Sequence, residues 1–151
     1  MKNILLLLLT FCCSVLQAQT LTQTLYFDFG SQIAAQGTLT EGPDANNHYW
    51  NNITNNTTEN KYAVAGTVYP SLINAENTST NYTLTLDTRF STNGRSGGGG
   101  LLEPTVEDLG DLAIASATED YFFIESGEDN SSFTFSNLDP QKGYKFYAFG
   151  S

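Results

Sequence analysis

The stretch that decides the fold class is YTLTLDTRF, residues 82–90. Within it, Tyr82, Leu84 and Leu86 alternate with threonines, which is the two-residue period of a strand with one buried and one solvated face. Threonine also favours strands, because its β-branched side chain fits a pleated surface. The stretch therefore predicts one β-strand over residues 82–90.

Six further segments have the composition of short strands, and turn-forming residues separate them. They lie at residues 25–29, 49–53, 67–73, 120–125, 132–138 and 144–149. Pro70 places the third of them at a sheet edge or a bulge. One short helix is allowed at residues 107–117, whereas residues 55–60 and 76–81 are polar loops. No repeat and no linker interrupts the pattern, so we predict a single all-β domain at residues 19–151, an antiparallel β-sandwich or jelly roll.

The charge balance excludes one class of partner. Sixteen Asp and Glu residues against six Lys and Arg residues give a net charge of −10. Nucleic-acid phosphates are bound by clustered Lys and Arg, so no nucleic-acid partner is expected. Hydrophobic residues make up 40% of the chain and aromatic residues 13%, which is too much for a disordered acidic tail.

The N-terminus has the three-part layout of a secretory signal peptide. Lys2 supplies a positive charge, residues 4–15 are mostly apolar, and Ala18 is a small residue before a polar chain. The apolar run is too short to span a bilayer comfortably, so no membrane span is expected. We predict a signal peptide at residues 1–18 and a secreted or cell-surface protein. The alternatives are a buried core helix and a lipoprotein signal, although Phe11 is bulky where the latter needs a small residue.

The side chains that most enzymes use for catalysis are scarce. Cys12 and Cys13 are the only cysteines, and both fall in the predicted signal peptide, so the mature chain has no disulfide and no thiolate nucleophile. His48 is the only histidine, and no Gly-x-Ser-x-Gly motif accompanies it. The sequence therefore predicts no catalytic residue.

A group of acidic residues is the candidate metal site. Glu107, Asp108 and Asp111 lie close together in the sequence, and calcium prefers oxygen ligands. No EF-hand spacing is present. These three residues are the candidates for a structural calcium ion, which is the only cofactor the sequence suggests. The alternative interpretation is that they are solvated loop carboxylates.

One aromatic segment is the candidate ligand site. Tyr49 and Trp50 offer flat apolar faces on which a sugar ring can stack. Asn51 and Asn52 follow them and can form hydrogen bonds with sugar hydroxyl groups. The alternative is that Trp50 belongs to the hydrophobic core of the sandwich.

Several stretches taken together resemble a known family. They are FDFGS at residues 27–31, WNNIT at residues 50–54, the block from residue 90 to residue 123, and the closing run at residues 133–151. They resemble the galactose-binding-like β-sandwich modules of secreted Bacteroidetes proteins, which accompany carbohydrate-active enzymes such as SGNH-type (GDSL-like) esterases. The resemblance implies further strands beyond Ser151, so we expect the domain to be truncated at its C-terminus. The Gly-Asp-Ser block of an SGNH hydrolase is absent from this chain.

These observations lead to one expected function and two alternatives. We expect a secreted, non-catalytic carbohydrate-binding or accessory module of a larger extracellular protein. Its partners would be a polysaccharide or glycan and downstream domains of the same polypeptide. The first alternative is the N-terminal scaffold part of an SGNH-type carbohydrate esterase. The second is a structural or adhesive cell-surface domain.

Overall fold

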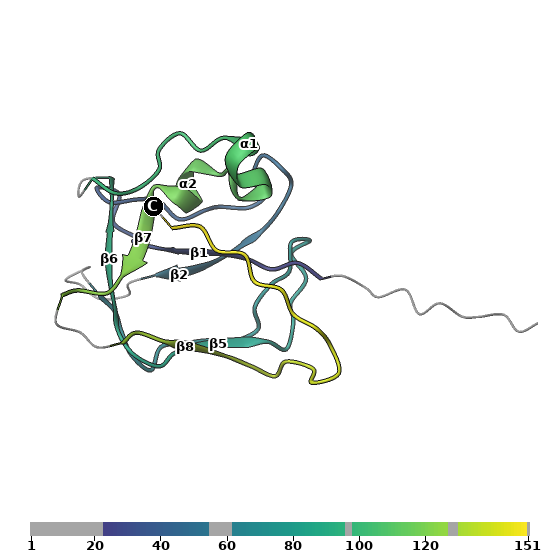
Figure 1. Ribbon diagram of the computed structural model, residues 1–151. Helices are drawn as coiled ribbons and strands as arrows, with labels where there is room; N and C mark the ends of the chain where they lie inside the picture. Colours follow the sequence, from purple (N-terminus) through teal and green to yellow (C-terminus); the bar gives the residue numbers. More distant parts are fainter. Residues whose placement is uncertain (1–22, 55–61, 96–97, 127–129, 151) are drawn as a thin grey trace, which may run out of the picture.

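The computed structural model describes residues 23–54, 62–95, 98–126 and 130–150 (Figure 1). The predicted signal peptide at residues 1–18 and the predicted loop at residues 55–60 lie outside these ranges. The strands of the described part are β1 (Tyr26–Gly30), β2 (Trp50–Thr54), β3 (Tyr62–Ala63), β4 (Val68–Tyr69), β5 (Thr83–Leu86), β6 (Phe90–Gly94), β7 (Asp120–Phe123) and β8 (Phe133–Ser136). The helical elements are α1 (Val106–Leu109), the 3-10 turn η2 (Gly110–Leu112) and α2 (Ala115–Thr118).

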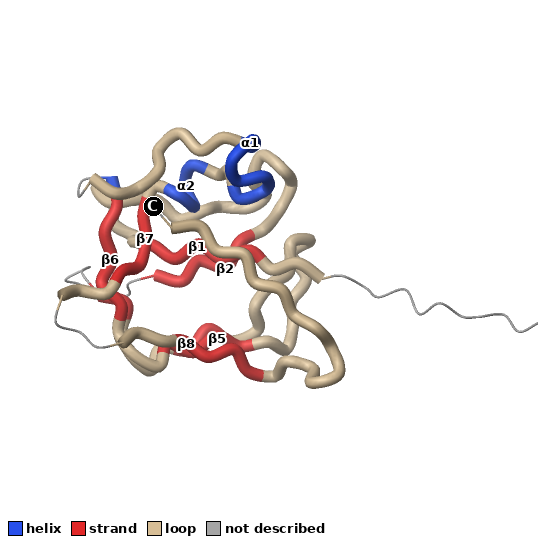
Figure 2. The backbone as a smooth tube through the Cα atoms, in the orientation of Figure 1, coloured by secondary structure: helices blue, strands red, loops and turns tan. Residues whose placement is uncertain are grey.

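The strands form three small sheets and give the chain its β-rich character (Figure 2). Two sheets are antiparallel, with the strand orders β3-β6-β7 and β4-β5-β8. The third sheet is the pair β1-β2. Its strands are parallel, whereas the sequence predicted an antiparallel arrangement. The segment at residues 31–49 joins these two strands, and it is long enough for the crossover that parallel pairing requires.

The elements α1, η2 and α2 make up the helical segment, residues 106–118. The β1-β2 pair lies between this segment and the β5-β8 pair (Figure 1). Within β1, the side chains of Phe27 and Phe29 pack against the main hydrophobic core, whose buried members are Ile53, Ala63, Leu72, Leu84 and Leu86. The ring of Phe29 lies 5.5 Å from that of Phe122 and 5.4 Å from that of Phe133. Such aromatic pairs add about 0.5–1.5 kcal/mol beyond the burial of their area.

A second, smaller cluster lies on the opposite face of β1. Tyr26 and Trp50 are opposite one another in the parallel register, and their rings are 5.0 Å apart. Leu112, Ile114 and Ala117 of the helical segment pack against them. The helical segment therefore covers the face of β1 that points away from the main core.

The helical segment was predicted in the right place but not as one helix. Thr105 begins α1: its hydroxyl accepts the backbone N–H of Asp108 at 3.2 Å. Gly110 then has a φ angle of 56°, which interrupts the helical path because glycine tolerates positive φ values. Two short helices and a 3-10 turn result in place of a single helix over residues 107–117.

The single strand predicted at residues 82–90 is wrong, because the segment forms two strands in two sheets. β5 ends at Leu86, and β6 begins at Phe90. Between them, the hydroxyl of Thr88 accepts the N–H of Ser132 at 2.8 Å, and the carbonyl of Ser132 accepts the N–H of Asp87 at 3.0 Å. The same carbonyl also accepts the N–H of Thr88 at 3.3 Å, so two residues lie opposite Ser132, as in a β-bulge, and the β5 ladder ends there.

The C-terminal prediction is also wrong: no strand forms at residues 144–149 in the described structure. The aromatic alternation is present, but a strand also needs a neighbour to complete its backbone ladder. Phe146 and Tyr147 are 72% and 81% exposed. By contrast, the segment at residues 67–73 behaves as Pro70 predicted, since β4 is short and lies at the edge of its sheet.

Candidate functional site

The predicted sugar-binding segment lies largely inside the fold. Trp50 is 6% exposed, and its indole Nε1 donates to Asp44 Oδ2 at 2.7 Å. Asn51 donates through Nδ2 to two backbone carbonyls and accepts the N–H of Ile73 at 2.9 Å. Asn52 bonds the backbone N–H and carbonyl of the loop residue Thr40 at 2.8 and 3.0 Å. These three side chains hold neighbouring loops in place.

Tyr49 is half-buried, as Asn51 and Asn52 are, and its ring packs against the backbone of Gly42. Asp44 organises the turn that precedes it, because its Oδ1 accepts the N–H groups of Asn46 and His48 at 2.8 and 2.9 Å. Burial opposes ionisation of Asp44, but the bonds from His48, Trp50 and Asn46 outweigh it and lower the pKa of the carboxyl group. Asp44 is therefore an ionised anchor for this turn.

The three predicted calcium ligands do not come together. Asp108 accepts the hydroxyl of Thr105 at 2.6 Å and completes the cap of α1. Asp111 accepts the hydroxyl of Tyr26 at 3.3 Å, and Glu107 is exposed in the first turn of the helix. Across the described ranges, no group of three His, Cys, Asp or Glu side chains is placed to hold a metal ion.

A buried cluster of acids, which is not among the predicted site residues, lies on the helix-facing side of β1. Asp28, Glu119 and Asp120 are 3%, 2% and 5% exposed. The segment at residues 31–41, called the cover loop here, runs over them. Asp120 Oδ2 accepts the N–H of Ser31 at 2.7 Å, and Asp28 Oδ2 accepts the N–H of Thr40 at 3.1 Å. Two carboxyl groups on two strands thus bind the two ends of the same loop.

The close packing around Asp120 depends on glycine. A Cβ atom added to Gly30 would lie 1.9 Å from Asp120 Oδ1, and one added to Gly37 would lie 2.0 Å from Asp120 Oδ2. A Cβ atom on Gly94 would lie 2.6 Å from the Cβ of Asp120. Only glycine leaves room for this carboxyl group, because any larger residue would overlap it.

The three acids differ in how their charge is compensated. Glu119 forms an ion pair with Arg95, whose Nε lies 2.7 Å from Oε2, and it also accepts the hydroxyl of Thr38 at 2.7 Å. Asp28 and Asp120 each bond the cover loop through Oδ2, but the Oδ1 atom of each is buried and has no hydrogen-bond partner in the described part of the chain. A buried acceptor without a partner is costly, and more so when it carries charge.

Proton binding is the response that this environment favours. Burial, together with the charge of Asp120, raises the pKa of Asp28 to about 7, although hydrogen bonds from Thr40 oppose the change. Burial also raises the pKa of Asp120 to about 6, with Glu119 adding to the effect and the Ser31 N–H and Arg95 opposing it. Both groups lie under the cover loop and are almost completely buried. The arrangement suits proton uptake and loop anchoring better than attack on a substrate.

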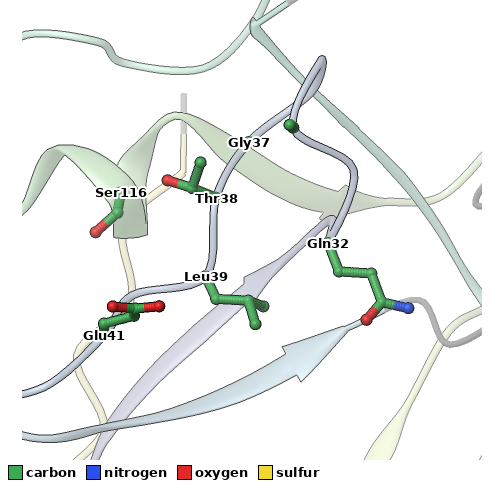
Figure 3. A pocket seen from close by; sticks show the side chains of 7 residues that line it. Gln32, Gly37, Thr38, Leu39, Glu41 and Ser116 are labelled. Carbon is green, nitrogen blue, oxygen red and sulfur yellow. The ribbon is translucent and has the colours of Figure 1, made fainter.

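The outer side of the cover loop forms a shallow, open hollow of about 520 Å³ (Figure 3). It is lined by Gln32, Ala34, Gly37, Thr38, Leu39, Glu41 and Ser116. The hydroxyl of Ser116 lies 2.9 Å from that of Thr40, which connects α2 to the cover loop. The cover loop therefore borders both the hollow and the buried acids.

One sequence signal for the acid cluster was available. In β1, the alternation that puts Phe27 and Phe29 on one face puts Tyr26 and Asp28 on the other, so the carboxyl group shares a face with an aromatic ring. Nothing local in the sequence connects Asp28 with Asp120 or with the glycines that pack around it.

Comparison with known proteins gives no relative. No protein-family model, no curated protein and no solved structure matches this chain.

We also find that none of the helices in the described ranges is both long enough and apolar enough to cross a membrane.

Proposed function

We propose that this chain is a secreted, non-catalytic β-sandwich module that binds a glycan weakly at the hollow of the cover loop. The observation that carries the proposal is the lining of that hollow. Glu41 provides a carboxylate beside Leu39, which is 43% exposed. The hydroxyl oxygens of Thr38 and Ser116 bond Glu119 and Thr40 and retain capacity to accept a further hydrogen bond. Polar groups around one apolar contact match a sugar ring, which has hydroxyl groups at its edge and C–H groups on its faces.

The hollow suits low affinity. It is shallow and open, so a bound sugar would keep much of its surface in water. The resemblance to galactose-binding-like modules adds support for the sandwich fold and for a carbohydrate ligand. The proposal places binding at the cover loop and not at Trp50, because the indole ring is buried and its N–H is bonded to Asp44.

Affinity electrophoresis of the secreted chain in gels containing soluble polysaccharides tests the proposal. At least one neutral polysaccharide should retard the protein. Leu39→Ala should weaken that binding about tenfold, which corresponds to about 1.4 kcal/mol. Val106→Ala is the matched control, since Val106 is 71% exposed on α1 and does not line the hollow. Absence of retardation across a broad panel, or equal weakening by both variants, would contradict the proposal.

A further inference from the structure

The cover loop is held at both ends by buried carboxyl groups from different strands. Asp120 of β7 accepts the N–H of Ser31, and Asp28 of β1 shares the N–H of Thr40 with Asn52, at 3.1 and 2.8 Å. Between these points, Thr38 donates to Glu119. The backbone of the cover loop therefore depends on the state of these carboxyl groups, and the loop also forms one wall of the hollow.

The charges around the pair do not cancel. The charge of Asp120 acts on Asp28, and the charge of Glu119 acts on both of them. Among the residues that the structure describes, Arg95 is the cation that faces the cluster, and it is bonded to Glu119. The other elements packed against β1 apart from β7, which are β2, β6 and α2, contain no titratable side chain, and Glu41 of the cover loop is exposed. With all three acids ionised, the cluster would hold three negative charges against one positive charge.

We propose that Asp28 and Asp120 form a proton-operated latch, in which uptake of a proton by the pair fixes both ends of the cover loop and loss of the proton loosens them. The geometric basis is that each carboxyl group uses one oxygen to bind the loop and buries the other without a partner. A proton removes one charge from the pair and turns an unpaired acceptor into a neutral O–H group.

The direction of the response follows from the pKa values. Those of both groups are raised above the ordinary value of 3.8, to about 7 for Asp28 and to about 6 for Asp120. The closed loop therefore binds protons more tightly than an open, solvated loop does. Lowering the pH from 8 to 5 should favour the closed loop, and raising it should favour opening. An effect on ligand binding would rest on the proposed function, whereas the loop response itself does not.

Hydrogen exchange of the backbone amides of Ser31, Gly37 and Thr40, corrected for the intrinsic pH dependence of exchange, tests the latch with no glycan present. In the wild-type protein, protection of these amides should be at least tenfold higher at pH 5 than at pH 8. Asp28→Asn should keep high protection at both pH values. Glu103→Gln is the control, because Glu103 is exposed and lies outside the cluster, and it should behave as the wild type does.

Several outcomes would overturn the latch: equal wild-type protection at pH 5 and pH 8, a full pH response retained in Asp28→Asn, or protection at pH 8 restored by Ca²⁺ and removed by EDTA. The last outcome would mean that the carboxyl groups bind a cation in place of a proton. If Asp28→Asn does not fold, the side-chain carboxyl ¹³C signals of the wild-type protein decide. Midpoints between pH 5 and pH 8 support the latch, and midpoints below pH 5 for both groups contradict it. A failure of glycan binding would leave all these results unchanged.

Discussion

The two faces of β1 are buried in opposite ways. On one face, Phe27 and Phe29 pack against rings from other strands, and the apolar contacts need no directional partner. On the other face, Asp28 is more deeply buried than these two rings, but its carboxyl group needs hydrogen bonds and forms them only in part. The comparison teaches that the apolar face supplies stability, while the polar face makes the position of a loop depend on protonation.

The largest effect is expected on the apolar face. Phe29→Ala removes a ring that contacts Phe122 and Phe133, and should lower the free energy of unfolding by about 3 kcal/mol. Urea denaturation measures the change. Val106→Ala, at an exposed site, should stay within about 0.5 kcal/mol of the wild type. A loss below about 1 kcal/mol for Phe29→Ala would show that the aromatic face is not the main source of stability.

A somewhat smaller effect is expected on the polar face. Gly30→Ala places a methyl group 1.9 Å from the position of Asp120 Oδ1, so the carboxyl group must move. The variant should lose about 1–3 kcal/mol of stability and also lose protection of the Ser31 amide. Gly143→Ala is the control, since nothing lies within 4 Å of the added methyl group, and it should be neutral or slightly stabilising. Equal stabilities of the two variants would contradict the close packing.

The smallest effect is expected at the helical segment, which packs over Tyr26 and Trp50. Thr105→Ala removes the hydroxyl that caps α1 and should cost about 1 kcal/mol. Because the helical segment packs against Trp50, its loosening should also shift the tryptophan emission toward longer wavelength. An unchanged thermal midpoint and an unchanged emission would mean that the helical segment does not protect this face.

The strand positions were predictable because they are local. The aromatic alternation predicted β1, β2, β7 and β8 within one or two residues of their ends. The pairing was less predictable: the turn at Asp87 and Thr88 divides a continuous strand pattern through bonds to a segment more than 40 residues away. The aromatic run at residues 144–149 shows the same point, because alternation alone supplies no neighbouring strand.

The candidate site was least predictable. The residues expected to bind sugar, Trp50, Asn51 and Asn52, use their polar groups to hold the fold. The buried acid pair depends on contacts such as the one between Ser31 and Asp120, which are 89 residues apart. A sequence shows the type of such residues, but their chemistry is set by burial and by distant partners, and neither has a local signature.

The central claim is that the polar face of β1 buries an uncompensated carboxyl pair. The most direct measurement is the free energy of unfolding of the wild type and of Asp28→Asn at pH 5 and pH 8, in 0.5 M NaCl to screen the net charge. Since the folded pKa of Asp28 is raised, the wild type should lose stability as the pH rises toward about 7. Between pH 5 and pH 8, Asp28→Asn should therefore gain about 2–3 kcal/mol of stability relative to the wild type. A wild type that is as stable at pH 8 as at pH 5 would contradict the account. So would an Asp28→Asn variant that is less stable than the wild type at pH 8.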